Sequence, residues 1–492
     1  MRHSGILMHI SSLPGPYGIG TLGASAFEFV DFLKSAGQHY WQILPVGPTG
    51  YGDSPYQSFS AFAGNHYFID LDLLIRQGLL LPEEAAPVCA DDARVDYGLL
   101  YNTRMDVLRK AYGRFSPEDP EFRAFRERHP WLEDYCLFMA LKSHFGGKPW
   151  TDWPEDIRRR EAAALAHYQA ILAEDIGFHR FLQFQFFRQW SAVHRYAQMQ
   201  GIEIIGDIPI YVPLDSADVW ASPESFQLGN DLHPESVAGV PPDSFSADGQ
   251  LWGNPLYNWD AMAQDGFRWW LNRIGGNAGL FDVIRIDHFR GIESYWSVPG
   301  GSTTAKDGHW VKGPGIALIH AIQEAFPTLH FIAEDLGYLT PEVMNLVHDS
   351  GFPGMKILEF AFDSREAGNY LPHTYTRNCI CYTGTHDNET LVQWENAITA
   401  EDRALARAYL GIGSGESLPQ AMIRCGFASV ADTFIVQMPD WLGLGKEARM
   451  NHPGCTDGSN WRWRCPADAL TKPLAERILA LTRLYHRDGR EQ

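Results

Sequence analysis

The stretch Phe281-Asp-Val-Ile-Arg-Ile-Asp-His288 is the clearest guide to the fold of this chain. It is short, almost continuously apolar, rich in β-branched residues, and it ends on a carboxylate, Asp287. Runs of this kind are typical of strands buried on both faces of a parallel sheet. Because side chains alternate along a strand, Arg285 points to the same face as Asp287. We therefore predict a buried strand that brings a charged pair to one rim of a sheet.

Seven further runs along the chain have the same character, and helix-like segments separate most of them. Ser25–Ala36 is one such helix, and Ser25 with Glu28 has the spacing of a capping box. Strands and helices that alternate eight times predict an α/β fold of the (β/α)8 TIM barrel class, with a doubly wound open sheet as the alternative. The eight predicted strands are Gly5–Ile10, Tyr40–Val46, Ile202–Ile210, Phe281–His288, His330–Leu336, Met355–Phe362, Cys379–His386 and Thr433–Trp441.

Two gaps between these strands are too long for simple connections. Residues 70–198 separate the second and third strands and have a mainly helical pattern, which predicts an inserted helical subdomain. Residues 211–265 follow the third strand and are rich in proline, glycine and aromatic residues. Long irregular segments in compact proteins are usually functional, so we expect a loop subdomain near the site. Residues 1–492 are thus predicted to form one barrel with two insertions.

Composition narrows the possible partners. The 492 residues carry a formal net charge of −20, which repels nucleic acid and anionic membranes but not a neutral substrate. The seven cysteines are scattered, so we expect reduced thiols and a cytoplasmic location. No apolar run has the length of a signal segment or a membrane span. The sequence gives no indication of the oligomeric state.

Carboxylates follow four of the predicted strands, namely Asp207, Asp287, Glu334 and Asp387. Asp after a strand is also common as a helix cap, but four such sites favour one active rim at the carboxyl ends of the strands. Glycoside chemistry needs two carboxyl groups, one that attacks or stabilises the anomeric carbon and one that protonates the leaving oxygen. Asp287 and Glu334 come from consecutive strands, and Arg285 is expected to keep Asp287 ionised.

Other motifs point to no cofactor. Gly18, Gly20 and Gly23 match the dinucleotide pattern G-x-G-x-x-G, but no acidic residue ends the following strand, which closes with Leu44-Pro-Val46. The histidines lack the H-E-x-x-H spacing of a zinc site. We therefore expect neither an organic cofactor nor a catalytic metal.

Nearly the whole chain resembles the amylomaltases, also called 4-α-glucanotransferases or disproportionating enzymes, which belong to the α-amylase clan. The combination of blocks is specific, although the short pieces around Asp287 and Asp387 recur across the clan. The blocks that carry the resemblance are Ser12–Gly20, Trp41–Asn65, Gly206–Val212, Trp252–Tyr257, Arg285–Gly291, Ala333–Gly337, Thr385–Asn388 and Asn460–Arg464.

The resemblance implies a role for each matching residue. Asp287 would be the nucleophile, Glu334 the acid/base and Asp387 the transition-state stabiliser of a retaining transfer between α-1,4-glucans and maltooligosaccharides. The remaining matching residues would contact sugar. They are Arg285, His386, Ser54, Tyr56, Asp207, Phe245, Gln250, Trp252 and Asn451. The resemblance also implies that no metal or organic cofactor is needed.

The covering loop departs from the family pattern, because Ser244 stands where an aromatic residue is usual between Asp243 and Phe245. This departure bears on how acceptor sugars stack. Two alternatives to a glucanotransferase stay open at this stage. One is an α-glucan hydrolase of the same clan, and the other is a glucan-binding protein without catalysis, which the intact carboxylates disfavour.

Overall fold

A computed structural model describes residues 2–50, 52–88, 93–242, 247–337, 339–365, 370–455 and 457–489. Within them, eight parallel strands form one sheet in the order β10-β11-β12-β1-β2-β3-β6-β9. Each predicted strand is present, although each is shorter than its apolar run. Their bounds are β1 His3–Leu7, β2 Tyr40–Gln42, β3 Glu203–Ile208, β6 Val283–Ile286, β9 His330–Ala333, β10 Gly354–Ile357, β11 Cys379–Tyr382 and β12 Thr433–Gln437.

The sheet curls into a barrel. The contact between its two end strands, β9 and β10, differs from the pairing of the other strands. The N–H of Ala333 at the end of β9 donates to the carbonyl of Pro353, just before β10, at 3.0 Å. The Asp335 carboxylate accepts from the N–H of Met355 at 2.7 Å. Gly354 leaves room for this carboxylate, since a Cβ there would lie 2.5 Å from an Asp335 oxygen. Asp335 therefore closes the barrel, next to Glu334.

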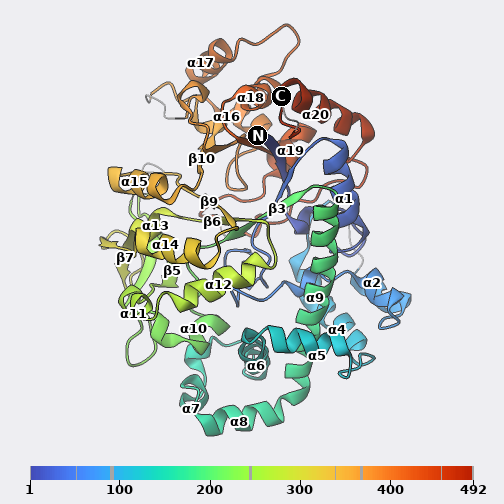
Figure 1. Ribbon diagram of the computed structural model, residues 1–492. Coiled ribbons are helices and arrows are strands. Elements are labelled where there is room, and N and C mark those ends of the chain that lie inside the picture. The colour runs from blue at the N-terminus through green and yellow to red at the C-terminus, as the bar shows by residue number, and fades with distance from the viewer. Residues whose placement is uncertain are drawn as a thin grey trace.

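Side chains from the strands fill the barrel interior, as continuous apolar runs require. The cluster consists of Leu7, Ile205, Val283, Ile332, Met355, Ile357, Ile380, Tyr382 and Ile435, with Tyr40 packed against it. Helices surround this barrel (Figure 1). They are α1 Ala24–Ser35, α9 Ala173–Met199, α12 Arg268–Ala278, α14 Ile316–Ala325, α15 Pro341–Ser350, α16 Leu391–Ala397, α17 Ala400–Leu410, α18 Leu418–Ala428, α19 Met438–Leu442 and α20 Lys472–Leu484.

Two local predictions were wrong. The capping box of Ser25 and Glu28 does not form, because α1 begins at Ala24 with Gly23 as its N-cap and no side chain caps it. A Cβ on Gly23 would lie 2.0 Å from an Asp70 carboxylate oxygen, so this glycine serves close packing. The alternation of strands and helices also lapses between β10 and β11, where the described residues form only short 3-10 turns.

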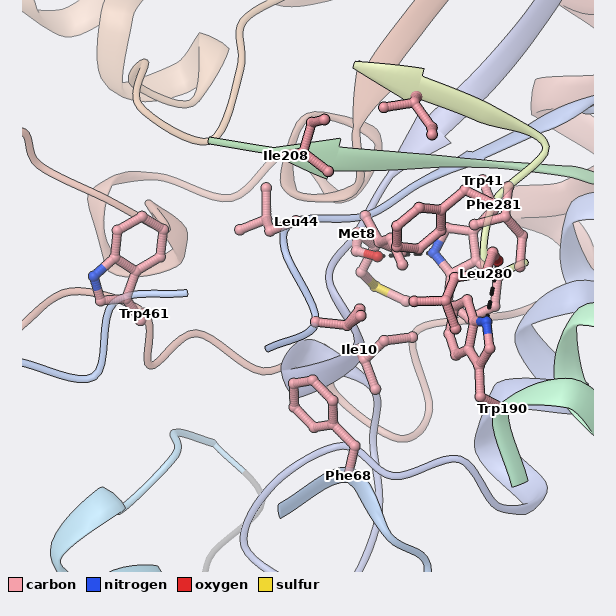
Figure 2. Close-up of a cluster of buried hydrophobic side chains, with 14 of the residues drawn as sticks. Met8, Ile10, Trp41, Leu44, Phe68, Trp190, Ile208, Leu280, Phe281 and Trp461 are labelled. Atoms are coloured by element: carbon pink, nitrogen blue, oxygen red, sulfur yellow. Dashed lines mark hydrogen bonds between the residues drawn. The ribbon is translucent and has the colours of Figure 1, made fainter. Parts of the chain in front are cut away.

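The segment 70–198 is helical, as predicted, and its last helix extends along the barrel. Trp190 of α9 packs edge-on against Phe281, and its indole N–H donates to the Leu280 carbonyl at 3.0 Å (Figure 2). The insertion is therefore anchored in the barrel wall. The helices before α9 are α2 Leu71–Arg76, α3 Pro82–Ala85, α4 Tyr97–Tyr112, α5 Pro120–Arg128, α6 Trp131–His144, α7 Glu155–Arg158 and α8 Ala162–Ile171.

The prediction of a loop subdomain at 211–265 needs correction. This segment holds β4 (Ser236–Val240) and β5 (Gln250–Pro255), with α10 (Ala217–Ala221) and α11 (Trp259–Gln264). The two strands join a second, antiparallel sheet in the order β5-β4-β7-β8. The other half of that sheet comes from β7 (Ser294–Pro299) and β8 (His309–Lys312), which follow the short helix α13 (Arg290–Glu293). Pairing between distant segments is invisible in a local pattern.

The six described cysteines are free thiols, and Cys89 lies outside the described residues. Among the described residues, no helix is both long enough and apolar enough to cross a membrane. The two ends of the chain meet beside β1, where Arg487 donates to the His3 carbonyl at 3.0 Å (Figure 1).

Candidate active site

A cavity of about 930 Å³ opens at the carboxyl ends of the barrel strands. Of the residues predicted from the sequence, Arg285, Asp207 and Glu334 do not line this cavity, and their contacts are described below. Phe245 lies outside the described residues. The predicted residues that line it are Ser54, Tyr56, Gln250, Trp252, Asp287, His386, Asp387 and Asn451.

Arg285 joins two carboxylates from neighbouring strands. Its Nη1 lies 2.7 and 2.6 Å from the two oxygens of Asp207 and 2.9 Å from Oδ1 of Asp287. The Arg285 and Asp207 side chains are only 4% and 1% exposed. Burial lowers the pKa of Arg285, but Asp207 and Asp287 outweigh it and hold that pKa well above its ordinary value. The guanidinium is therefore always charged.

Asp287 does not have the pKa that its arginine alone would suggest. Burial raises the pKa of Asp287 well above its usual range, Arg285 lowers it, and Asp207, Glu334 and Asp387 raise it further. Arg285 thus lowers the pKa of Asp287, in the predicted direction, while burial and the neighbouring carboxylates act against it. Closely spaced carboxyl groups titrate together. Asp287 and the carboxyl groups around it therefore retain a proton more readily than isolated carboxyl groups would.

Glu334 follows β9 and contacts His288, the residue after Asp287. Its Oε2 accepts from the N–H of His288 at 2.7 Å and its Oε1 from the N–H of Leu336 at 2.8 Å. Burial raises the pKa of Glu334, although Arg285 and these two backbone bonds oppose the rise. A raised pKa is what a general acid near neutral pH requires.

The backbone around the cavity contains unusual conformations. His288 has a φ of 53°, in the left-handed region that non-glycine residues seldom adopt. Asp53 and Trp461, which also line the cavity, have φ values of 59° and 66°. Strain of this kind gathers at functional sites because surrounding contacts over-determine the geometry. At His288 the conformation accompanies the hydrogen bond to Glu334.

Asp387 lines the cavity together with its neighbours His386 and Asn451. Oδ1 of Asp387 accepts from Nδ2 of Asn451 at 2.6 Å and lies 3.3 Å from Nε2 of His386. Burial lowers the pKa of His386, so the imidazole is neutral at pH 7. Tyr56 stacks on His386 with ring centroids 5.1 Å apart, and its hydroxyl donates to Asp207 at 2.7 Å. Tyr56 thus connects His386 with Asp207.

Aromatic rings complete the cavity. Trp252 of β5 lies edge-on to His288 with centroids 4.8 Å apart, and its indole N–H donates to Oε1 of Gln250 at 3.2 Å. Trp461 lies 5.9 Å from the rings of both Tyr56 and His386. The sequence did not mark Trp461 as a site residue, although it lies in the Asn460–Arg464 block. Asp53 was also missed, although it lies in the Trp41–Asn65 block.

Comparison with known proteins decides the family. Residues 8–471 match the 4-alpha-glucanotransferase family. The chain belongs to this family. A 4-alpha-glucanotransferase of Clostridium butyricum is 50% identical over 98% of this chain and 100% of its own length. One of Thermus thermophilus is 48% identical over 99% of each. The solved amylomaltase from Streptococcus agalactiae in complex with acarbose superposes with a TM-score of 0.96, at 43% identity over 99% of this chain and 100% of that one.

These findings confirm two predictions. The chain is a 4-α-glucanotransferase, a glycosyl-transferring enzyme, and its fold is a (β/α)8 barrel. The carboxylates discussed above occupy the rim where such barrels hold their active sites.

Proposed function

We propose that this 4-α-glucanotransferase moves segments of α-1,4-glucans and maltooligosaccharides by a retaining double displacement. Asp287 is the nucleophile, Glu334 the acid/base and Asp387 the stabiliser. The observation that carries the proposal is that Asp287 lines the cavity with its Oδ1 2.9 Å from the Arg285 guanidinium, and that Asp387 lines the same cavity. The net charge of −20 favours a neutral partner of this kind over nucleic acid.

In the first displacement, a carboxylate oxygen of Asp287 attacks the anomeric carbon of the donor glucan. The bond to the leaving 4-oxygen breaks, and Glu334 gives that oxygen its proton. Positive charge develops at the anomeric carbon, and the negative charge of Asp387 stabilises it. The product is a covalent glycosyl-enzyme with inverted configuration.

In the second displacement, Glu334 is ionised and accepts the proton of the 4-hydroxyl of an acceptor glucan. That oxygen attacks the anomeric carbon and releases Asp287, so the configuration is inverted again. The neutral His386 ring and the Tyr56 hydroxyl are suited to sugar hydroxyls, and Ser54 lies beside them.

Transfer competes with hydrolysis, and the outcome depends on what occupies the acceptor position. Trp252 and Trp461 present apolar rings around a wide cavity, which suits a second sugar and disfavours ordered water. The family resemblance extends this proposal to Phe245 and to Ser244, which stands where an aromatic residue is usual in the covering loop. The amylomaltase of Streptococcus agalactiae was solved in complex with acarbose, which supports a saccharide as a ligand of this chain.

The test is incubation with maltotriose alone, with product lengths and total reducing ends followed over time. We expect glucose plus a ladder of longer maltooligosaccharides at constant reducing ends. Glu334→Gln should lose turnover while acarbose binding persists, and Asp287→Asn should accumulate no covalent glycosyl-enzyme. Full turnover in Glu334→Gln, or a trapped glycosyl adduct in Asp287→Asn, would contradict these assignments.

A further inference from the structure

The loop after β12 is tied to the loop after β11 by three hydrogen bonds. The N–H of Asn451 donates to the His386 carbonyl at 3.0 Å. Nδ2 of Asn451 donates to Oδ1 of Asp387 at 2.6 Å, and Nη2 of Arg449 donates to the Asp387 carbonyl at 2.8 Å. The backbone and the carboxylate of Asp387 are thus both held from the neighbouring loop.

One guanidinium organises this junction. Besides Asp387, Arg449 bonds the carbonyl of Asn451 through Nε at 2.8 Å, so it joins the two residues that contact each other through their side chains. Its Nη1 lies 3.6 Å from Oε1 of Glu389. Arg449 is 15% exposed and is not among the residues that line the cavity. It therefore acts on Asp387 and Asn451 rather than on a sugar.

Two acidic side chains, Glu359 and Asp440, are buried close to the loop that carries Asp387. Asp440 accepts from the Thr383 hydroxyl and from the Leu391 N–H, both at 2.7 Å, and a Cβ on Gly384 would lie 2.7 Å from Oε1 of Glu359. Burial raises the pKa of Glu359, Asp440 and Glu389 raise it further, and Arg449 lowers it. A raised pKa favours the neutral form of Glu359, so Arg449 is held by its hydrogen bonds and by its 3.6 Å contact with Glu389.

We infer that Arg449 is a positioning residue for the stabilising carboxylate of Asp387. This inference rests on the role proposed above for Asp387. Asp387 is 46% exposed on its own loop, so without the bonds from the neighbouring loop its carboxylate would sample other orientations. Electrostatic stabilisation of a transition state depends on groups that are already oriented, and small displacements are costly.

The first experiment measures kcat and KM for maltotriose disproportionation in Arg449→Met and Arg449→Lys. Met removes all of the bonds, and we expect kcat to fall by roughly 10- to 100-fold with little change in KM. Lys keeps the charge but cannot serve both carbonyls in the same geometry, so its kcat should be intermediate. Arg424→Met is the matched control, since Arg424 also joins a carboxylate, Glu416, to a backbone carbonyl, that of Leu410. The control should leave kcat unchanged.

The decisive measurement is a double-mutant cycle between Arg449→Met and Asp387→Asn, with an activated α-glucosyl fluoride donor to keep slow rates measurable. If Arg449 acts through Asp387, its substitution has no further effect on kcat in the Asp387→Asn background. Equal losses in both backgrounds, or an unchanged kcat in Arg449→Met, would overturn the inference. Should Arg449→Met not fold, Arg449→Lys in the same cycle separates the same two outcomes. An unaffected Asp387→Asn enzyme would instead refute the proposed function.

Discussion

At the residue scale, the site is governed by one cation shared between two carboxylates. Arg285 satisfies buried Asp207 through both oxygens and reaches Asp287 with the same nitrogen. The charge near Asp287 is consequently less positive than the local Arg-x-Asp pattern suggests. Burial raises the pKa of Asp287, and the other carboxylates raise it further. Rate and pH dependence should therefore respond to neighbours of Asp287 that never touch the reacting atoms.

The first prediction concerns Asp387→Asn. Asp387 raises the pKa of Asp287, so removing its negative charge lowers that pKa. The acid limb of the kcat/KM profile, where activity falls as Asp287 becomes protonated, should move to lower pH by on the order of one unit. The profile of kcat/KM against pH checks this, because it reports groups of the free enzyme. Asp31→Asn, on the outer face of α1, is the control and should leave the limb in place. A shift to higher pH would contradict the charge argument.

At the scale of elements, β6 is held to β3 and α9 by the carboxylate of Asp282, at the start of the strand that leads to Asp287. Oδ2 of Asp282 accepts from the Ile204 N–H at 2.8 Å and lies 2.9 Å from Nε2 of His194. Oδ1 accepts from Gln198 at 2.7 Å. Burial raises the pKa of Asp282, but these bonds outweigh it and the pKa is lowered. The ionised carboxylate therefore stabilises the junction.

The second prediction is that Asp282→Asn lowers the free energy of unfolding by about 1.5–3 kcal/mol at pH 7. A lowered folded-state pKa means that this contribution is fully present above the unfolded value of about 3.9 and is lost as the pH falls through the folded value. The difference between the two proteins should therefore shrink below about pH 4. Thermal midpoints across pH measure it.

Asp349→Asn is the control for this series, because Asp349 is exposed near the end of α15 and pairs with its neighbour His348. Its effect should be within about 0.5 kcal/mol. A difference between Asp282→Asn and the parent protein that grows as the pH falls would show that the sign of the pKa argument is wrong.

At the scale of the whole molecule, the helical insertion is bonded to the segment that follows β2. Gln183 of α9 bonds both the N–H and the carbonyl of Gly64, at 2.7 and 2.9 Å. Gln189 does the same for Asp70, the first residue of the insertion, at 2.7 and 3.2 Å. A Cβ on Gly64 would lie 1.9 Å from the Phe186 ring, so the contact is close. The segment anchored in this way also carries Ser54 and Tyr56.

The third prediction is that insertion and barrel unfold in a single calorimetric transition. Gln183→Ala leaves two buried backbone groups without partners and should cost about 2 kcal/mol or more, lowering the midpoint of the whole transition. Gln200→Ala, at the C-cap of α9, removes a bond from the exposed Lys34 side chain and should leave the midpoint almost unchanged. An earlier transition that melts helix while transferase activity persists would show instead that the insertion is an autonomous domain, and would contradict the proposal of one domain over residues 1–492.

Much of the barrel could be predicted from the sequence because its signals are local. A buried parallel strand needs a short apolar run, and each of the eight runs became a strand. The period of two along β6 put Arg285 and Asp287 on one face, where they are in contact. The cytoplasmic location stays a prediction.

Only the tertiary structure decided how distant segments combine. The sheet of β4, β5, β7 and β8 pairs residues near 237 with residues near 298, and no local pattern records such pairing. The same holds for Asn451, which was expected to contact sugar and which donates to Asp387 in the structure. The pKa of Asp287 likewise depends on its burial and on charges from four strands. Strand identity follows from the burial of each run, whereas charge and contact depend on distances that exist only once the chain has closed its barrel.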